Sequence, residues 1–166
     1  MPIGNSALIR GIASAGKHLR PGLRIIGVQA EGAPAYYLSW RSGVPVTTDM
    51  CDTIADGLAT RAPVPENVQA LRELVDDVRL VSDEQMLNAI RHLWVKEQIK
   101  VEPAGAASTA AWLGNFSCEV EQPEVLLVTG ANVLEPVFRQ ALKTKREFFL
   151  KKPLTIYYTR GSSVSE

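Results

Sequence analysis

Apolar residues alternate along the chain between a helical period and short continuous runs, and this alternation predicts an α/β fold. A short apolar segment at residues 1–3 is followed by a turn of small residues and then by a helical pattern. Residues 23–28 are typical of a buried strand, because they are rich in β-branched side chains. The order strand, helix, strand predicts a βαβ unit, and thus a mostly parallel sheet with helices on both faces in three layers. The apolar face expected for the first helix consists of Leu8, Ile12, Ala15 and Leu19.

The rest of the chain continues this pattern. A capping box opened by Ser82 and closed by Gln85 marks the start of the clearest helix. Its core stripe is expected to be Met86, Leu87, Ile90, Leu93 and Trp94. A short helix or a turn is expected at residues 33–40, and other helices at residues 67–74, 104–113 and 136–150. Strands are expected at residues 77–81, 125–128 and 154–158. We expect one unit over residues 1–133, and a helix with a strand-like tail of unassigned role over residues 134–166.

Composition and charge narrow the class of protein. The chain has 166 residues, with 18 Lys and Arg against 18 Asp and Glu, so charge gives no reason to expect nucleic acid or a membrane surface as partner. No apolar run approaches the roughly 20 residues that span a bilayer. Cys51 and Cys118 lack metal-site spacing, and we expect a reduced, cytoplasmic setting. His18 and His92 have no second ligand four residues on, and both are expected on the solvated surface.

Two loops are candidates for ligand binding. The turn at residues 4–8 comes directly before a helix, where backbone N–H groups and the helix dipole attract phosphate. Asn5 and Ser6 in such a place are also compatible with plain helix capping. The stretch at residues 52–59 is either a capped loop followed by a helical turn or a loop that faces a ligand. Pattern alone leaves both questions open.

These loops and four further stretches, taken in order, resemble one family. The chain is similar to the carboxyl-terminal half of serine/threonine dehydratases, the pyridoxal-phosphate lyases of the tryptophan-synthase-β type (fold type II). The resemblance implies part of that family's large domain, and it extends from Pro2 to about Val133. The matching stretches are residues 4–9, 24–33, 52–57 (the most specific), 71–78, 101–106 and 129–132.

The resemblance implies roles for particular residues and a reaction. It implies that Thr129 hydrogen bonds to the pyridine nitrogen of pyridoxal phosphate, that Glu102 lies near the ring edge, and that Gly57 lines the cofactor cleft. The family reaction converts L-serine or L-threonine to a 2-oxo acid and ammonia. The cofactor phosphate would be held by backbone N–H groups of Gly4, Asn5, Ser6, Ala7 and Leu8.

Three departures from the family pattern qualify this expectation. The family's loop is usually four glycines, and three of them are replaced here by residues whose Cβ atoms resist positive φ. Gln29 and Ala35 stand where some members have cation-binding carboxylates, so no metal is expected. The Schiff-base lysine lies in the family's amino-terminal half, which these residues do not match. Lys17, Lys96 and Lys100 lie on or beside helices. We therefore expect no catalytic residue in this chain and no turnover by it alone.

Three interpretations follow. The chain is a dehydratase-like half-domain that needs a separate amino-terminal half carrying the lysine, or pairs as a homodimer, and acts on a small amino acid. Alternatively it is a non-catalytic module that binds pyridoxal phosphate, an amino acid or another anion. In the third interpretation it is an interaction protein with a basic last helix, although a solvated helix face is the better account of those charges. The basic residues are Arg139, Lys143, Lys145, Arg146, Lys151 and Lys152.

Overall fold

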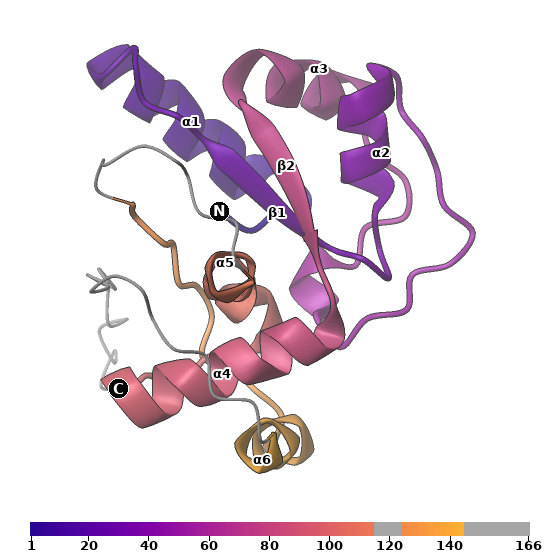
Figure 1. The fold of residues 1–166 in the computed structure, drawn as a ribbon. Helices are drawn as coiled ribbons and strands as arrows, with labels where there is room; N and C mark the ends of the chain where they lie inside the picture. The colour runs from indigo at the N-terminus through magenta and orange to yellow at the C-terminus, as the bar shows by residue number, and fades with distance from the viewer. Residues whose placement is uncertain (115–123, 145–166) are drawn as a thin grey trace, which may run out of the picture.

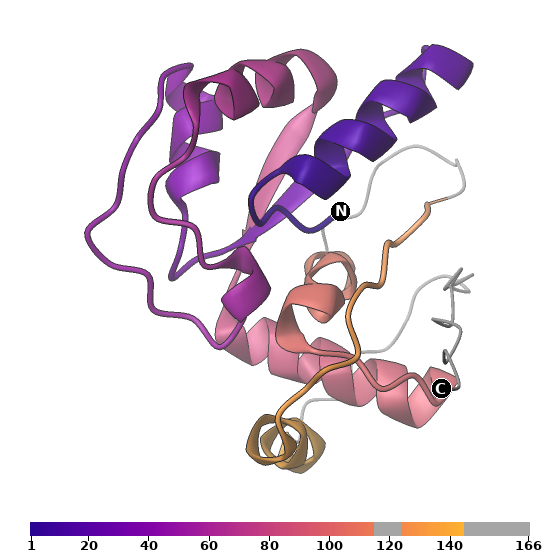
Figure 2. The ribbon, with the colours of Figure 1, turned by 180° about the vertical axis from the view of Figure 1, so that it is seen from behind.

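The computed structural model describes residues 1–114 and 124–144 and arranges them in three layers (Figures 1 and 2). Two parallel strands form the middle layer, and helices cover both of its faces. In chain order the elements are α1 (Ala7–Leu19), β1 (Ile26–Ala30), α2 (Ala35–Ser42), the 3₁₀ turn η1 (Asp56–Leu58), α3 (Pro65–Leu74), β2 (Asp77–Val81), α4 (Asp83–Glu97), α5 (Pro103–Leu113) and α6 (Glu135–Lys143).

The sheet confirms the βαβ unit expected from the sequence. β1 pairs in parallel with β2 from Ile26 opposite Asp77 to Ala30 opposite Val81. On its other side β1 meets the amino-terminal segment, because Pro2 bridges in parallel to Val28 and the Ile3 N–H donates to the Val28 carbonyl at 2.8 Å. β1 is thus flanked on both sides. It begins three residues later than the predicted strand and ends two residues later, at Ala30.

Each face of the sheet buries its own apolar cluster. α1, α2 and α3 lie over one face, where Ile25 and Val78 join side chains from these helices. α5 contacts both strands from the other face, where Val28 and Val81 point, and α4 packs on α5. α6 packs on α4 and contributes Phe138 to the same cluster. The three-layer α/β class is confirmed, while the boundary expected at residue 133 stays a prediction.

The predicted start and core stripe of α4 are confirmed. The Ser82 hydroxyl accepts from the Gln85 N–H at 3.2 Å, and the Gln85 side chain accepts from the Ser82 N–H at 2.8 Å. This reciprocal capping satisfies two of the N–H groups that a helix start leaves without partners. Trp94 packs edge-on against Phe138 with ring centroids 5.4 Å apart, which joins α4 to α6.

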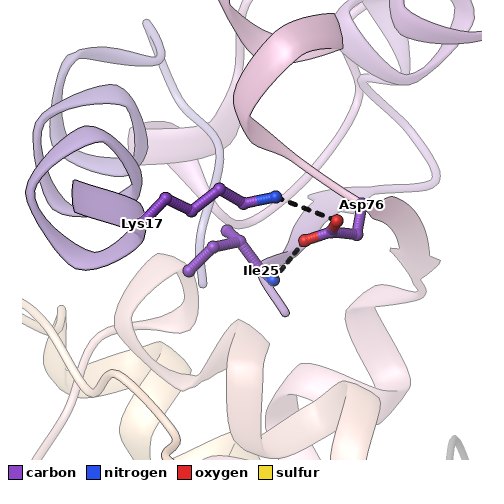
Figure 3. A network of polar contacts seen from close by, with 3 residues as sticks. All are labelled: Lys17, Ile25 and Asp76. Carbon is purple, nitrogen blue, oxygen red and sulfur yellow. Dashed lines mark hydrogen bonds and ion pairs between the residues drawn. The ribbon is translucent and has the colours of Figure 1, made fainter. Parts of the chain in front are cut away.

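One carboxylate ties the end of α1 to the start of the sheet (Figure 3). Asp76 accepts from the Lys17 ammonium at 2.9 Å and from the Ile25 N–H at 2.7 Å. Burial alone would raise the pKa of Asp76, but these two hydrogen bonds and the Lys17 and Arg24 charges outweigh it and lower that pKa. The ionised carboxylate therefore fixes how α1 returns to β1.

The apolar face predicted for α1 is wrong. Ile9 and Ala13 are the buried residues, and Ile9 contacts the Gly27 region of β1. α1 carries apolar residues on two sides, and the sequence period alone does not tell which side meets the sheet. The four residues of the predicted face all lie at the surface: Leu8 (47% exposed), Ile12 (37%), Leu19 (84%) and Ala15.

His92 is also misplaced by the prediction. It is only 8% exposed, and burial lowers its pKa. α4 contacts both α5 and α6. The buried surface of α4 is therefore wider than the single apolar stripe from which the exposure of His92 was predicted. His18 is exposed, as expected.

The strand predicted at residues 125–128 does not form. These residues make no strand ladder with the described part of the chain, and Val125 is 66% exposed. A continuous apolar run becomes a parallel strand only where a neighbouring strand offers backbone partners. The last predicted helix ends at Lys143. Cys118 and the predictions for residues 145–166 lie outside the described residues.

Candidate functional site

A cavity of about 410 Å³ lies where four segments distant in sequence meet. The segments are the loop before α1, the η1 turn, the start of α5 and the loop at Thr129. This volume is within the usual range of roughly 300–1,000 Å³ for small-molecule sites. Of the eight site residues predicted from the sequence, Ala7 alone does not line the cavity. The seven that do are Gly4, Asn5, Ser6, Leu8, Gly57, Glu102 and Thr129.

The loop before α1 opens a helix N-terminus toward this cavity. Ser6 has φ 70° and ψ −5°, a left-handed conformation that glycine usually supplies. The side-chain oxygen of Asn5 accepts from the Ala7 N–H at 3.1 Å, and the first turn of α1 contains no acidic residue. Ser6 is 2% exposed, and its hydroxyl has no hydrogen-bond partner among the described residues. A helix start of this kind attracts an anion.

A hydrogen-bond network holds the loop in this conformation. The Asn67 side-chain amide donates to the Asn5 carbonyl at 3.2 Å and to the Tyr36 hydroxyl at 3.0 Å. The Tyr36 hydroxyl lies 3.5 Å from the same carbonyl, and the Arg10 guanidinium donates to the Asn67 side-chain oxygen. The loop is thus attached to both α2 and α3. We name Arg10, Tyr36 and Asn67 the loop anchor.

Gly4 lets the loop approach the η1 turn closely. A Cβ on Gly4 would lie 2.2 Å from the Gly57 carbonyl oxygen, well inside contact distance. The glycine is therefore required by the packing of two backbones. A similar approach joins α5 to the Thr129 loop, because a Cβ on Gly105 would lie 1.5 Å from the Thr129 carbonyl oxygen.

Two carboxylates, those of Asp56 and Glu102, line the cavity. Glu102 is the N-cap of α5, and its N–H donates to the Gly130 carbonyl at 3.1 Å, which holds the Thr129 loop in place. Burial, and then the nearby Asp56 carboxylate, raise the pKa of Glu102. Its side chain therefore keeps a proton to higher pH than an ordinary glutamate. Asp56 was missed by the sequence reasoning, although it directly precedes Gly57 in the most specific matching stretch.

The cavity walls contain no Lys or Arg among the described residues. An anion at the α1 end would be held by backbone N–H groups, the helix dipole and hydroxyls, whereas the Glu102 end favours a neutral or protonated group. A phosphorylated heterocycle fits both ends. No group of three or more His, Cys, Asp or Glu among the described residues could hold a metal ion.

A second cavity, of about 630 Å³, lies along the outer edge of β2. Tyr37, Trp40 and Arg41 line it together with residues 77–80. It is larger, but it contains neither a helix N-terminus nor any residue predicted for the site. The cavity at the α1 loop is therefore the candidate functional site.

Comparisons with known proteins show the family of the chain. A family model described as pyridoxal-phosphate dependent enzyme matches residues 1–130. The chain belongs to the pyridoxal-phosphate dependent enzyme family. It is 36% identical over 133 residues to an L-threonine ammonia-lyase of Geobacter sulfurreducens, a match that covers 80% of this chain and 33% of that protein. It is 36% identical over 135 residues to the catabolic L-threonine dehydratase TdcB of Escherichia coli K12. That match covers 80% of this chain and 41% of the dehydratase.

A solved T.th. threonine deaminase has the same fold over most of the chain. The TM-score is 0.74 at 34% identity, and the match covers 79% of this chain and 48% of that one. These findings confirm the resemblance to threonine dehydratases and the fold-type-II assignment, and pyridoxal phosphate is the cofactor of the family. The chain spans between a third and a half of the length of these three relatives. No helix among the described residues has the length and apolar character needed to cross a membrane.

Proposed function

We propose that this chain forms the phosphate-binding and ring-nitrogen side of the site of a pyridoxal-phosphate ammonia-lyase that acts on serine or threonine. The main support for this proposal is that the residues predicted for the site come together in space. Seven residues from four separate segments, chosen from the sequence for one cofactor, line a single cavity with an open helix N-terminus at one end. The names of the relatives supply the reaction class.

In this proposal, different parts of the cavity bind the phosphate and the pyridine ring of the cofactor. The N–H groups at the start of α1 hold the phosphate, and the Thr129 hydroxyl faces the pyridine nitrogen. A hydroxyl there leaves the nitrogen unprotonated, which suits loss of water from the β-carbon. When bound, pyridoxal phosphate supplies the electron withdrawal that makes this elimination possible.

Glu102 holds a proton at the wall near the ring edge. Its pKa is raised first by burial and then by Asp56. The repulsion between the two carboxylates is relieved when Glu102 is protonated, and a protonated carboxyl can donate to an acceptor in the cavity. We propose that Glu102 orients the ring through such a hydrogen bond.

The lysine that the chemistry needs is not in the described part of this cavity. Lys17 is paired with Asp76 at 2.9 Å, and the Lys100 ammonium lies over the Phe138 ring at 5.1 Å from its centroid. We propose that the residues of this chain do not turn over serine or threonine alone. The lysine would come from a further region, in the same or a separate polypeptide.

The exposed face of α1 is the proposed contact for that region. Leu8, Ile12 and Leu19 lie at the surface on one side of the helix, and Leu8 also lines the cavity. A region that packed on this face would cover apolar surface and border the site at the same time. A second copy of this chain is the alternative occupant, and it would bring no new lysine motif.

Equilibrium dialysis against pyridoxal phosphate, followed by an assay of 2-oxo acid formation from serine and threonine, tests the proposal. We expect saturable binding of the cofactor, no turnover by the chain alone, and turnover when a lysine-bearing amino-terminal region of a relative is added. Binding without turnover even after that addition would favour a binding module. Ordinary enzymatic turnover by the chain alone would contradict the proposal, and so would a lack of binding.

A further inference from the structure

The side chain of Asp83 bonds to a distant loop instead of capping the helix that it begins. α4 already has a complete capping box, formed by Ser82 and Gln85. Both carboxylate oxygens of Asp83 reach the stretch before η1, where the Thr53 hydroxyl donates to one at 2.6 Å and the Ile54 N–H donates to the other at 3.0 Å. The helix dipole favours an acid at this position, but it does not account for these two bonds.

The two bonds to Asp83 fix the backbone that leads into η1. A hydroxyl that donates to a carboxylate makes a charge-assisted hydrogen bond, which is stronger than one between neutral groups. The same Thr53 hydroxyl accepts from the Ala55 N–H at 3.1 Å, so it links two residues of one turn. Ala55 is fully buried, and its carbonyl accepts from the Leu58 N–H at 2.8 Å. The start of α4 therefore holds η1 from one side.

η1 is also packed closely against the other walls of the cavity. Asp56 and Gly57 line the cavity from this turn. The Gly57 carbonyl lies against Gly4, and a Cβ on Gly57 would lie 2.9 Å from the Ala104 Cβ atom. A displacement of the turn therefore changes the shape of the cavity, and it changes the separation between the Asp56 and Glu102 carboxylates.

We propose that Asp83 is a positioning residue for the cofactor site, and that it holds η1 at the separation from Glu102 that binding of pyridoxal phosphate requires. It acts through Thr53 and Ile54 and does not touch the cofactor. None of these three residues lines the cavity. This inference rests on the proposed function and deepens it, because it assigns the placement of one cavity wall to a side chain outside the cavity.

Substitutions at both ends of the bond between Asp83 and Thr53 test the proposal. Asp83→Asn removes the charge and leaves a single side-chain oxygen for two donors. Thr53→Val removes the hydroxyl at similar size, whereas Thr53→Ser keeps it. Glu66→Gln is the matched control, because Glu66 is an exposed acid in the first turn of another helix, α3. Urea denaturation of each variant measures stability separately from the effects on the site.

The pKa of Glu102 reports where η1 stands, and carbon NMR of its carboxyl measures it in the chain without cofactor. Among the described residues, Asp56 and Glu102 are the titratable side chains that line the cavity. The pKa of Glu102 is raised by burial and then by Asp56. The two carboxylates repel, so a turn released from Asp83 lets them separate.

We expect the pKa of Glu102 to fall in Asp83→Asn and in Thr53→Val. Asp56→Asn removes the neighbouring charge outright and should give a larger fall in the same direction. Thr53→Ser and Glu66→Gln should leave the pKa of Glu102 as it is. A loss of stability alone would not produce this pattern.

Equilibrium dialysis gives the second measurement, the affinity for pyridoxal phosphate. We expect Asp83→Asn and Thr53→Val to bind it about tenfold more weakly than the unchanged chain, a usual effect of losing one hydrogen bond to a charged group. Thr53→Ser and Glu66→Gln should match the unchanged chain. If Asp83→Asn folds poorly, the pair Thr53→Val and Thr53→Ser keeps the test decisive, because it changes only one of the two bonds.

Three results would overturn the inference. If the pKa of Glu102 is unchanged in both Asp83→Asn and Thr53→Val, Asp83 does not place the turn, and the proposed function still stands. The same conclusion follows if both variants keep full affinity for pyridoxal phosphate. If the unchanged chain binds no pyridoxal phosphate, the inference and the proposed function fail together.

Discussion

Gly4 is the residue on which the shape of the site depends most directly. The Gly57 carbonyl occupies the space that a side chain on Gly4 would need, at 2.2 Å from the Cβ position. Since both partners are backbone, a methyl group there can be accommodated only by moving the loop away from η1. The separation of the loop from Glu102 and Thr129 would change with it.

Gly4→Ala should lower the free energy of unfolding by roughly 1–3 kcal/mol, a typical cost of overpacking, and should weaken binding of pyridoxal phosphate. Urea denaturation and equilibrium dialysis measure the two effects. Gly11→Ala is the matched control, because Gly11 lies within α1 with open space around its Cβ position. There the same change should stabilise the chain by roughly 0.5–1 kcal/mol. Equal effects at both positions would refute the close approach.

The buried His92 gives the fold a pH dependence. Burial depresses the pKa of His92 in the folded chain below its ordinary value of 6.5, with Glu97 raising it and Lys96 lowering it to smaller extents. As the pH falls below 6.5, the unfolded chain takes up a proton that the folded chain does not. The stability that comes from a neutral His92 is thus present above pH 6.5 and lost as the pH falls through its folded pKa.

The free energy of unfolding, measured by urea denaturation between pH 7.5 and pH 5, should therefore decrease with falling pH. His92→Gln should reduce that slope, because the substitution removes the group that takes up the proton. A slope that stays the same in His92→Gln would show that burial of this histidine does not set it.

At the residue scale, the order of the motifs chose seven residues that line one cavity. Their roles in binding the cofactor stay a prediction. Asp56 was missed although it adjoins Gly57. The unused Ser6 hydroxyl and the burial of His92 depend on packing between distant segments, which no single stretch of sequence contains.

At the element scale, α1 shows why periodicity is not enough. Its apolar residues follow the helical period on two sides, and either side could in principle meet the sheet. The structure buries Ile9, while Ile12 is 37% exposed. Ile9 packs at the sheet surface beside Ile3 and Gly27, where a Cβ on Gly27 would lie 3.4 Å from the Ile9 side chain. These contacts select the Ile9 side of α1 for burial.

Ile9→Ala and Ile12→Ala make the same chemical change on the two sides of α1. The first should cost roughly 2–5 kcal/mol of unfolding free energy, because it leaves a cavity in the core. The second should cost less than about 1 kcal/mol, as expected near the surface. Thermal or urea unfolding measures the pair, and a reversed order would restore the face predicted from the sequence.

The apolar run at residues 125–128 shows that composition alone does not make a strand. Its composition is typical of a central strand, yet it has no ladder with the described chain. A strand needs a neighbour as well as a pattern, whereas the helix α4 carries its own start signal in Ser82 and Gln85. Local signals therefore predicted the helices well and this strand poorly.

At the scale of the whole molecule, the three layers bring the site together. The sheet carries α1, α2 and α3 on one face and α5 on the other (Figures 1 and 2). The cavity is lined by loops from both sides. Tyr36 of α2 and Asn67 of α3 hold the loop before α1 in place. Glu102 and Thr129 line the cavity from the α5 side. The site is thus a product of the layered fold, which the βαβ order predicted.

Amide hydrogen exchange with and without pyridoxal phosphate is the decisive measurement for the proposed phosphate site, because it reports which backbone N–H groups the cofactor protects. We expect slower exchange at the start of α1, from Ser6 to Ile9, on addition of pyridoxal phosphate and little change there with pyridoxal. Protection confined to another part of the chain, or equal protection by both compounds, would contradict it.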